Sequence, residues 1–281
     1  MRAMNKISII MLGMFATMAF FVSCEDDKDE TQKPSSTPTV PNGGNNTEKP
    51  DIKTITIKGV EFKMVKVSSG TFQMGATAEQ GSDAMDNEYP IHSVTLSDYY
   101  IGQTEVTQEL WEVVMGSNPS NFMDSEQSPV EQVSWSDCQE FITKLNKLTG
   151  EKFRLPTEAE WEFAAKGGNE GKGYKYSGSN DVNAVAWYKN NSGGKTHPVA
   201  KKQANELGLY DMCGNVWEWC SDWKGDYSGT AQTNPKGANT GTRRILRGGS
   251  WDYTARDVRV SYRGSNAPDN RNSNNGLRLA L

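Results

Sequence analysis

The sequence predicts a mixed α+β domain in which short strands and helices are joined by long irregular segments. Alternating runs such as His92–Leu96 are typical of half-buried strands, and three other stretches carry apolar residues at helical spacing between capping residues. The segments 75–91 and 167–206 are polar and irregular, and the second is rich in Gly and Asn. Because long irregular segments in a compact domain usually carry function, we expect the functional surface on loops.

The first 23 residues are typical of a bacterial lipoprotein signal peptide. Arg2 and Lys6 precede an apolar run that ends at Val22 and is short for a membrane span. Cleavage before Cys24 would leave a cysteine for lipidation; the alternative is an ordinary signal peptide with an incidental cysteine. The acidic residues after Cys24 resemble surface-export signals of some Gram-negative lipoproteins. This predicts an outer-membrane lipoprotein that faces the cell surface or the periplasm.

Residues 24–52 are predicted to form a flexible tether. They are rich in Pro, Thr, Ser, Asn and Gly and contain almost no apolar residues, so they cannot bury enough surface to fold. A coil of this length spans roughly 30 Å on average. The folded domain is therefore expected at 53–281, held off the membrane, with the lipid as its one membrane contact.

The composition fits one globular domain and argues against a nucleic-acid-binding protein. The chain has 281 residues, enough for one domain with a sizeable core. Its formal net charge is −5, without the basic surplus that nucleic acids require. Eight Trp and ten Tyr indicate large aromatic surfaces in the core or in a ligand site.

The regular elements can be placed in chain order. Strands are expected at 60–67, 71–74 and 92–96, with further core strands around Ile245-Leu246 and Leu277–Leu279. Three helices are expected, each bounded by a capping residue and a glycine. These helices run from Thr107 to Gly116, from Ser136 (with Gln139 completing its capping box) to Gly150, and from Thr157 (with Glu160) to Gly167.

Residues 208–219 read Gly-Leu-Tyr-Asp-Met-Cys-Gly-Asn-Val-Trp-Glu-Trp, which is too rich in Trp, Gly and Asn for an ordinary helix or strand. The carboxylates of Asp211 and Glu218 flank small positions that expose backbone carbonyls, and hard cations prefer oxygen ligands. The stretch could therefore hold Ca²⁺, although the spacing is not that of an EF-hand. A polar turn beside a tryptophan core explains the same residues.

This stretch resembles the GLYDM-x-GNVWEW motif of the formylglycine-generating-enzyme, or sulfatase-modifying-factor, family. The resemblance extends in order from about residue 58 to the C-terminus and implies a loop-rich sulfatase-modifying-factor fold related to C-type lectin domains. It also implies a structural Ca²⁺ at Asp211, Gly214, Val216 and Glu218. The other matching motifs are Phe72-Gln73-Met74-Gly75, Glu105-Val106-Thr107, Pro129-Val130 with Ser134-Trp135, Arg154 through Glu162, Arg247 through Trp251, and Gly276-Leu277-Arg278.

The chain departs from the family at its chemistry. The founding activity of the family resembles a copper(I) oxidase that converts a sulfatase cysteine to formylglycine with two cysteines just after the RGGS motif. Copper(I) prefers thiolates, and no cysteine follows Cys220 in this chain. Copper is therefore not expected, no catalytic residue is assigned, and the chain is predicted to be no enzyme of this type. Cys138 is expected in the core, while Cys213 and Cys220 form either a disulfide or two buried thiols.

The tail 252–281 has an unusual composition. It contains no Lys, Glu, Gln, Met or Trp and is filled with Asn, Asp, Ser, Tyr, Arg and Gly, which suit adaptable contacts as in antibody loops. It resembles the C-terminal segment of retroelement-diversified variable proteins, in which mutated asparagine codons yield such residues; ordinary Asn-rich loops are the alternative. Arg247, Arg263 and Arg278 are expected to be scaffold residues that pair with acidic groups. The predicted ligand-binding residues are Trp251, Asp252, Tyr253, Thr254, Asp257, Tyr262 and Asn266.

These observations favour a surface-displayed, non-catalytic module that binds a protein or glycan, with Tyr253 and Tyr262 as its aromatic anchors. Two alternatives remain from the sequence. One is a formylglycine-generating-type oxidase that acts on sulfatase cysteines, and the other is a structural subunit of an envelope complex.

Overall fold

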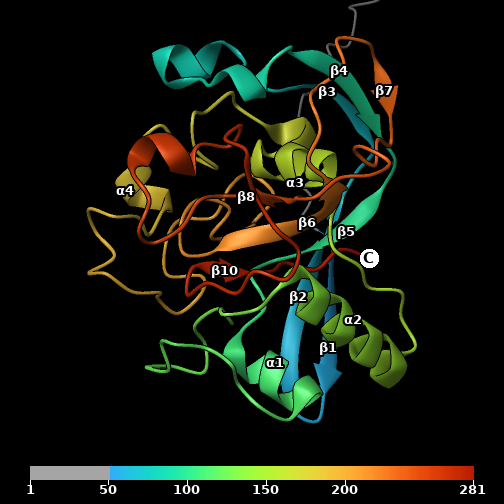
Figure 1. The fold of residues 1–281 in the computed structure, drawn as a ribbon, viewed down its shortest axis with the longest axis vertical. Helices are drawn as coiled ribbons and strands as arrows, with labels where there is room; N and C mark the ends of the chain where they lie inside the picture. The colour runs from blue at the N-terminus through green and yellow to red at the C-terminus, as the bar shows by residue number, and fades with distance from the viewer. Residues whose placement is uncertain (1–50) are drawn as a thin grey trace, which may run out of the picture. The chain divides into compact units, whose positions relative to one another are not determined.

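The structure, a computed structural model, describes residues 51–281. The predicted signal peptide, Cys24 and nearly all of the predicted tether lie outside the described residues. Within 51–281 the chain forms the expected α+β architecture, with three small sheets, four α-helices and long connections (Figure 1). No helix in this part of the chain has the length and apolar character needed to cross a membrane.

Ten strands and four α-helices make up the regular structure of residues 51–281. The strands are β1 (Ile52–Ile57), β2 (Val60–Val67), β3 (Gly70–Met74), β4 (His92–Leu96), β5 (Tyr99–Gly102), β6 (Trp217–Trp223), β7 (Gln232–Thr233), β8 (Arg244–Arg247), β9 (Gly264–Asn266) and β10 (Asn275–Gly276). The α-helices are α1 (Gln108–Met115), α2 (Trp135–Thr149), α3 (Glu158–Ala165) and α4 (Val182–Val185), and the 3-10 helices are η1 (Ala78–Asp83), η2 (Asp86–Glu88), η3 (Gly168–Glu170) and η4 (Ala255–Val258).

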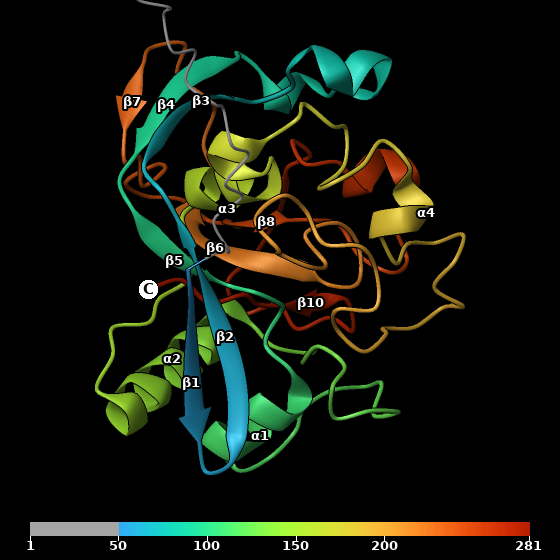
Figure 2. The same cartoon turned by 180° about the vertical axis from the view of Figure 1, so that it is seen from behind.

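Two three-stranded sheets flank a four-stranded sheet. β1, β2 and β5 form an antiparallel sheet, and β3, β4 and β7 form another in which β7 runs parallel to β4. The third sheet has the order β10-β6-β8-β9 and lies in the middle of the domain, with α3 beside it (Figure 1). Seen from behind, the β1–β2 hairpin extends away from β5 towards α1 (Figure 2).

The hairpin β1–β2 begins at Ile52, one residue before the predicted start of the domain. β2 matches the strand expected at 60–67, whereas β1 was not predicted, although the turn between them has a local signal. Lys58 and Gly59 both have positive φ, at 49° and 92°, which suits a two-residue turn between antiparallel strands. β5, also unpredicted, is four residues long and pairs with β2.

The helices start and end close to where the caps predict. The hydroxyls of Thr107 and Thr157 accept hydrogen bonds from the backbone in the first turns of α1 and α3. The predicted cap of α2 is wrong: Ser134 caps this helix, with Asp137 completing the capping box. The Ser136 hydroxyl instead donates to Asp269, so a tertiary contact removes it from the capping role.

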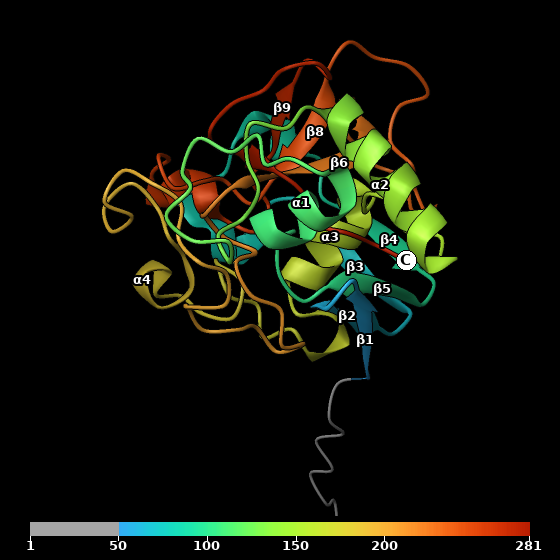
Figure 3. The same cartoon turned by 90° about the horizontal axis from the view of Figure 1, so that it is seen from below.

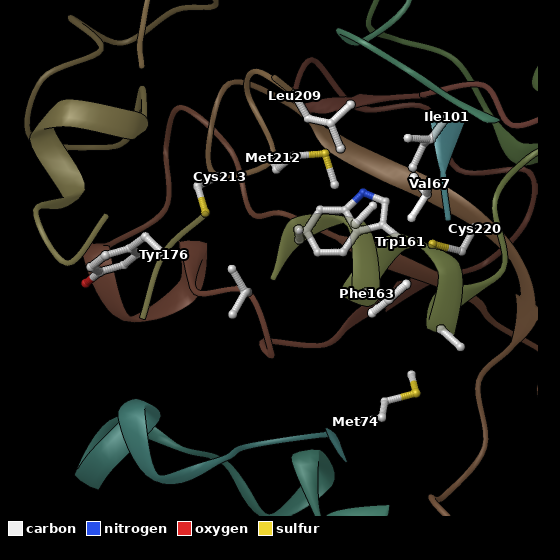
Figure 4. Close-up of a cluster of buried hydrophobic side chains, with 14 of the residues drawn as sticks. Val67, Met74, Ile101, Trp161, Phe163, Tyr176, Leu209, Met212, Cys213 and Cys220 are labelled. Atoms are coloured by element: carbon white, nitrogen blue, oxygen red, sulfur yellow. The ribbon is translucent and has the colours of Figure 1, made fainter. Parts of the chain in front are cut away.

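Tryptophans fill two apolar cores. Trp161 of α3 is fully buried in one of them, near Leu209 and Met212 (Figure 4). In the other, Trp111 of α1 stacks on Phe141 of α2 with ring centroids 4.8 Å apart, and Figure 3 shows these helices side by side from below.

The prediction that 208–219 contains no regular strand is wrong for its last three residues. Trp217, Glu218 and Trp219 begin β6, where they pair with both β8 and β10. The buried Trp219 donates from its indole Nε1 to the Val133 carbonyl at 3.0 Å. A strand that buries both faces does not alternate in polarity, which is why the sequence pattern did not show it.

Candidate functional site

Buried arginine–carboxylate pairs hold the C-terminal segment on the core. Arg247 pairs with Glu162, and Arg263 contacts Glu158 through two hydrogen bonds of 2.7 and 2.8 Å. All four side chains are buried. Although burial opposes ionisation of Glu158, the adjacent Arg263 holds its pKa below the usual value. With the Arg278 pair described below, the prediction that these arginines are scaffold residues is confirmed.

A third pair fixes the segment that carries Tyr262. Arg259 donates to Glu88 at 2.6 Å, and the Ser261 hydroxyl donates to the same carboxylate at 2.5 Å. Arg247 donates to the backbone carbonyl of Tyr262. Buried charged groups therefore fix the backbone of this polar segment, and a rigidly held backbone is suited to presenting a binding surface.

The segment that carries Tyr262 borders a pocket of about 220 Å³. Its walls come from β6, β8, β9 and the tail, which are far apart in the sequence. No cysteine, histidine or carboxylate of the described residues is part of this wall. The lining residues are Trp217, Arg243, Leu246, Tyr253, Tyr262, Gly264, Ser265, Asn266, Asn272, Asn274 and Asn275.

Trp217 forms the aromatic base of the pocket. Tyr253 meets its ring edge-to-face at 5.1 Å, and the Tyr262 ring lies 5.9 Å away at 40°. Gly264 permits this arrangement, because a Cβ there would lie 2.9 Å from the Trp217 ring. Burial is the main cause that raises the pKa values of Tyr253 and Tyr262, so both present neutral hydroxyls at physiological pH.

The predicted ligand-binding residues do not all gather at this pocket. Tyr253, Tyr262 and Asn266 line it. Asp252 reaches its rim, because its carboxylate accepts from Asn274 at 3.1 Å. Trp251 lies elsewhere: it packs edge-to-face on Phe122 at 5.3 Å and does not line the pocket.

Thr254 and Asp257 serve the local fold. The Asp257 carboxylate accepts from the backbone N–H and the hydroxyl of Thr254, at 3.1 and 2.6 Å. The two residues form the capping box of η4, in which Asp257 Oδ2 accepts both hydrogen bonds. The Thr-x-x-Asp pattern is a visible signal for this role.

Several pocket residues were missed from the sequence. Trp217 was read as part of the motif stretch, and Arg243 had no motif around it. Asn272 and Asn275 lie in the tail, whose asparagine content was the available signal. No sequence pattern links 217 with 253, since only the fold brings β6 beside the tail.

The three cysteines of the described part are buried thiols. This decides between the two alternatives for Cys213 and Cys220 in favour of unbonded side chains. Burial raises the pKa of Cys213 to about 12 and that of Cys138 and Cys220 well above the usual value. Neutral, enclosed thiols are poor nucleophiles and poor metal ligands.

A buried acidic cluster surrounds the motif stretch 208–219. Both oxygens of Glu218 accept from Arg278, which approaches to 2.7 Å, and Trp161 donates to Glu218 at 2.6 Å. Glu105 accepts from the backbone N–H of Val216 at 3.0 Å. Asp211 accepts from the backbone at Ala200. Of these three buried carboxylates, only Glu218 forms hydrogen bonds with an arginine.

The pKa values of Asp211 and Glu105, which form no ion pair with an arginine, are both raised. Burial raises the pKa of Asp211 to about 6, with Glu218 adding to the shift. Burial, followed by Asp211 and Glu218, raises the pKa of Glu105 well above its usual value. A bound cation would favour the ionised form of both groups.

The residues at the predicted Ca²⁺ positions fit a hard cation in part. Gly214 and Val216 are buried, and within 51–281 their carbonyl oxygens accept no hydrogen bond. Asp211 adds a carboxylate. Glu218 is already occupied by Arg278 and Trp161. Among residues 51–281 no three carboxylate, histidine or cysteine side chains converge as metal ligands, so backbone carbonyls would supply much of the coordination.

Comparison with known proteins gives a consistent result. Residues 52–281 match the family model of the sulfatase-modifying factor enzyme 1-like domain. A Paenibacillus barcinonensis protein named chaperone protein LppX is 34% identical over 270 residues, covering 78% of this chain and 89% of the relative. The formylglycine-generating enzyme of Streptomyces coelicolor is 30% identical over 284 residues, with 77% and 88% coverage.

Two solved structures are similar over most of their length. Treponema denticola variable protein 1 has 38% identity and a TM-score of 0.74, covering 83% of this chain and 99% of that one. PvdO from Pseudomonas aeruginosa has 25% identity and a TM-score of 0.68, covering 83% and 98%.

Proposed function

The chain belongs to the sulfatase-modifying-factor (formylglycine-generating-enzyme) family, and we propose that it is a non-catalytic member that binds a protein or glycan in the Trp217–Tyr253–Tyr262 pocket. The single observation that carries the proposal is the lining of that pocket. Tyrosine rings, asparagine amides, a serine and an arginine offer aromatic contact and hydrogen bonds, without the thiols on which the known family oxidation depends. The similarity to a variable protein supports the same proposal.

Selection for binders tests it. The wild-type protein, screened against a glycan array and a peptide-display library, should enrich ligands that the double variant Tyr253→Ala, Tyr262→Ala no longer binds. Because both rings pack on Trp217, this variant loses some packing as well. Asn272→Arg is therefore a second test, because the Asn272 side chain makes no hydrogen bond within 51–281 and the larger arginine would fill the pocket without breaking one.

Tyr89→Ala is the matched control, since Tyr89 is 45% exposed and lies outside the pocket. It should leave binding unchanged. Ligands that bind all of these variants equally well would place the binding site elsewhere on the molecule.

The runner-up function is oxidation of sulfatase cysteines, and we predict that it is absent. Purified protein incubated with copper, oxygen and a cysteine-containing sulfatase peptide should produce no formylglycine above a no-enzyme control, measured by mass spectrometry. The reason is that no cysteine follows Cys220, and the thiols at 138, 213 and 220 are buried. The Streptomyces coelicolor enzyme serves as the positive control. Conversion of the peptide cysteine to formylglycine well above the no-enzyme control would favour the oxidase function over the binding function.

The proposal includes anchoring through a lipid on Cys24, with the domain displayed at the envelope of a Gram-negative bacterium. Its support is the apolar run that ends at Val22-Ser23-Cys24, outside the described residues. Cys24→Ala should move the protein from the membrane fraction to the soluble fraction, because acyl chains contribute about 0.8 kcal/mol per buried CH₂. Unchanged fractionation of this variant would mean that Cys24 is not the anchor.

A further inference from the structure

A second pocket, of about 250 Å³, lies between α3, β4 and the segment that follows β6. It shares no lining residue with the Trp217–Tyr253–Tyr262 pocket. Its volume corresponds to about eight water molecules at the density of the liquid, enough for a small organic molecule. The residues that give it its chemistry are His92, Glu158, Asp222, Tyr227 and Arg263.

Asp222 presents an unused acceptor to this pocket. The residue is only 3% exposed. Its Oδ2 accepts from the Glu158 backbone N–H at 3.1 Å and from the Ser221 hydroxyl at 2.9 Å, whereas its Oδ1 accepts from no residue in 51–281. Burial, and then the charge of Glu158, raises the pKa of Asp222 to about 7. Because Oδ1 is not among the fully enclosed atoms of residues 51–281 that lack a partner, it is accessible from the pocket and can accept a hydrogen bond from a ligand donor.

His92 presents a second acceptor. Its Nδ1 lies 3.0 Å from the Pro90 carbonyl, which can only accept, so Nδ1 carries the proton. In the neutral ring Nε2 then exposes its lone pair, and it has no partner among residues 51–281. His92 is 4% exposed, and the Tyr227 ring packs against it with centroids 4.8 Å apart. The imidazole is therefore held in place.

The charges around the pocket exclude an anionic ligand. Arg263 is committed to Glu158, to the carbonyls of Asn87 and Gly225, and to the face of Tyr227 at 3.8 Å. Within 51–281 neither Asp222 nor Asp226, which also lines the pocket, has a salt-bridge partner. The site therefore offers surplus negative charge and two acceptors that are not used by the fold.

We propose that this pocket is a second ligand site that binds the primary ammonium group of a small molecule, with Asp222 Oδ1 and His92 Nε2 as its acceptors. An ammonium group carries three donors and a positive charge, which match both acceptors and the uncompensated carboxylate. The site is independent of the protein- or glycan-binding pocket.

The probe is 1,4-diaminobutane, with 1,4-butanediol as the neutral compound of equal length, and binding to the wild-type protein is followed by ligand-observed NMR. The diamine should bind and the diol should not. Asp222→Asn keeps the shape of the side chain and its contact with Glu158, and should weaken diamine binding about tenfold or more, as expected for loss of a charge-assisted hydrogen bond. His92→Gln is a second variant that decides the question if Asp222→Asn does not fold.

Two controls separate this site from other surfaces. Asp269→Asn, at an exposed carboxylate outside the pocket, should bind the diamine as the wild type does. The Tyr253→Ala, Tyr262→Ala variant should also keep diamine binding, so failure of the first pocket and failure of the second are distinguishable. Equal binding of diol and diamine, diamine binding that ignores both Asp222→Asn and His92→Gln, or binding of Zn²⁺ alone would overturn the proposal.

Discussion

Replacing Arg278 by methionine should lower the free energy of unfolding by about 3–5 kcal/mol, as expected when one partner of a buried ion pair is removed. Arg278 is fully buried and donates to Glu218 through Nε and Nη2, and also to the carbonyls of Gly102 and Tyr210. Its charge also lowers the pKa values of the neighbouring Glu105 and Asp211 carboxyl groups. Without it the cluster would bury like charges together.

Arg271→Met is the matched control. Arg271 also makes a two-point contact with a carboxylate, that of Asp137, at 2.7 Å for both hydrogen bonds, but its side chain is 54% exposed. Exposed pairs contribute about 0–1 kcal/mol, so this variant should unfold close to the wild type in urea. If the two methionine variants lose similar stability, the buried cluster does not have the role assigned to it.

We propose that Ca²⁺ binds at the predicted positions, and its removal should then produce the second large effect. A ligand that binds only the folded state at 100 times its Kd adds about 2.7 kcal/mol, which raises the Tm of a domain of this size by roughly 5–10 °C. The physical reason is that the carbonyls of Gly214 and Val216, buried and without a hydrogen bond from any residue in 51–281, lie in the same stretch as the carboxylate of Asp211. The measurement is the Tm of the wild type with Ca²⁺ and with chelator.

The Ca²⁺-dependent increment in Tm should disappear in Asp211→Ala and persist in Asp98→Ala, which removes an exposed carboxylate elsewhere. The increment is the proper readout, because Asp211 has a positive φ of 58° and alanine would be strained there regardless of the metal. An identical Tm of the wild type with Ca²⁺ and with chelator would contradict the prediction that the domain binds Ca²⁺.

Local signals predicted the helices because their caps are local. Thr107 and Thr157 each accept a hydrogen bond from a backbone N–H three residues ahead, an interaction complete within one turn. The cap of α2 was ambiguous, since Ser134 and Ser136 are each followed at the third position by a side chain able to complete a box. The contact of Ser136 with Asp269, distant in the sequence, decided it.

The site could be predicted only in part, for the same reason. The composition of the tail identified Tyr253, Tyr262 and Asn266, which do line one pocket. The remaining wall comes from β6 and β8, whose residues enter it only through sheet pairing. Thr254 and Asp257 were assigned to ligand binding because their composition fitted, although their spacing already matched the capping box that they form.

Amide hydrogen exchange with a bound ligand tests the central claim most directly. A ligand selected from the glycan array or the peptide library should slow exchange in peptides that contain the 252–275 segment and the start of β6, because these form the Trp217–Tyr253–Tyr262 pocket. The hairpin β1–β2 should exchange as in the free protein. Protection confined to that hairpin or to the His92–Asp222 pocket, with 252–275 unchanged, would contradict the account.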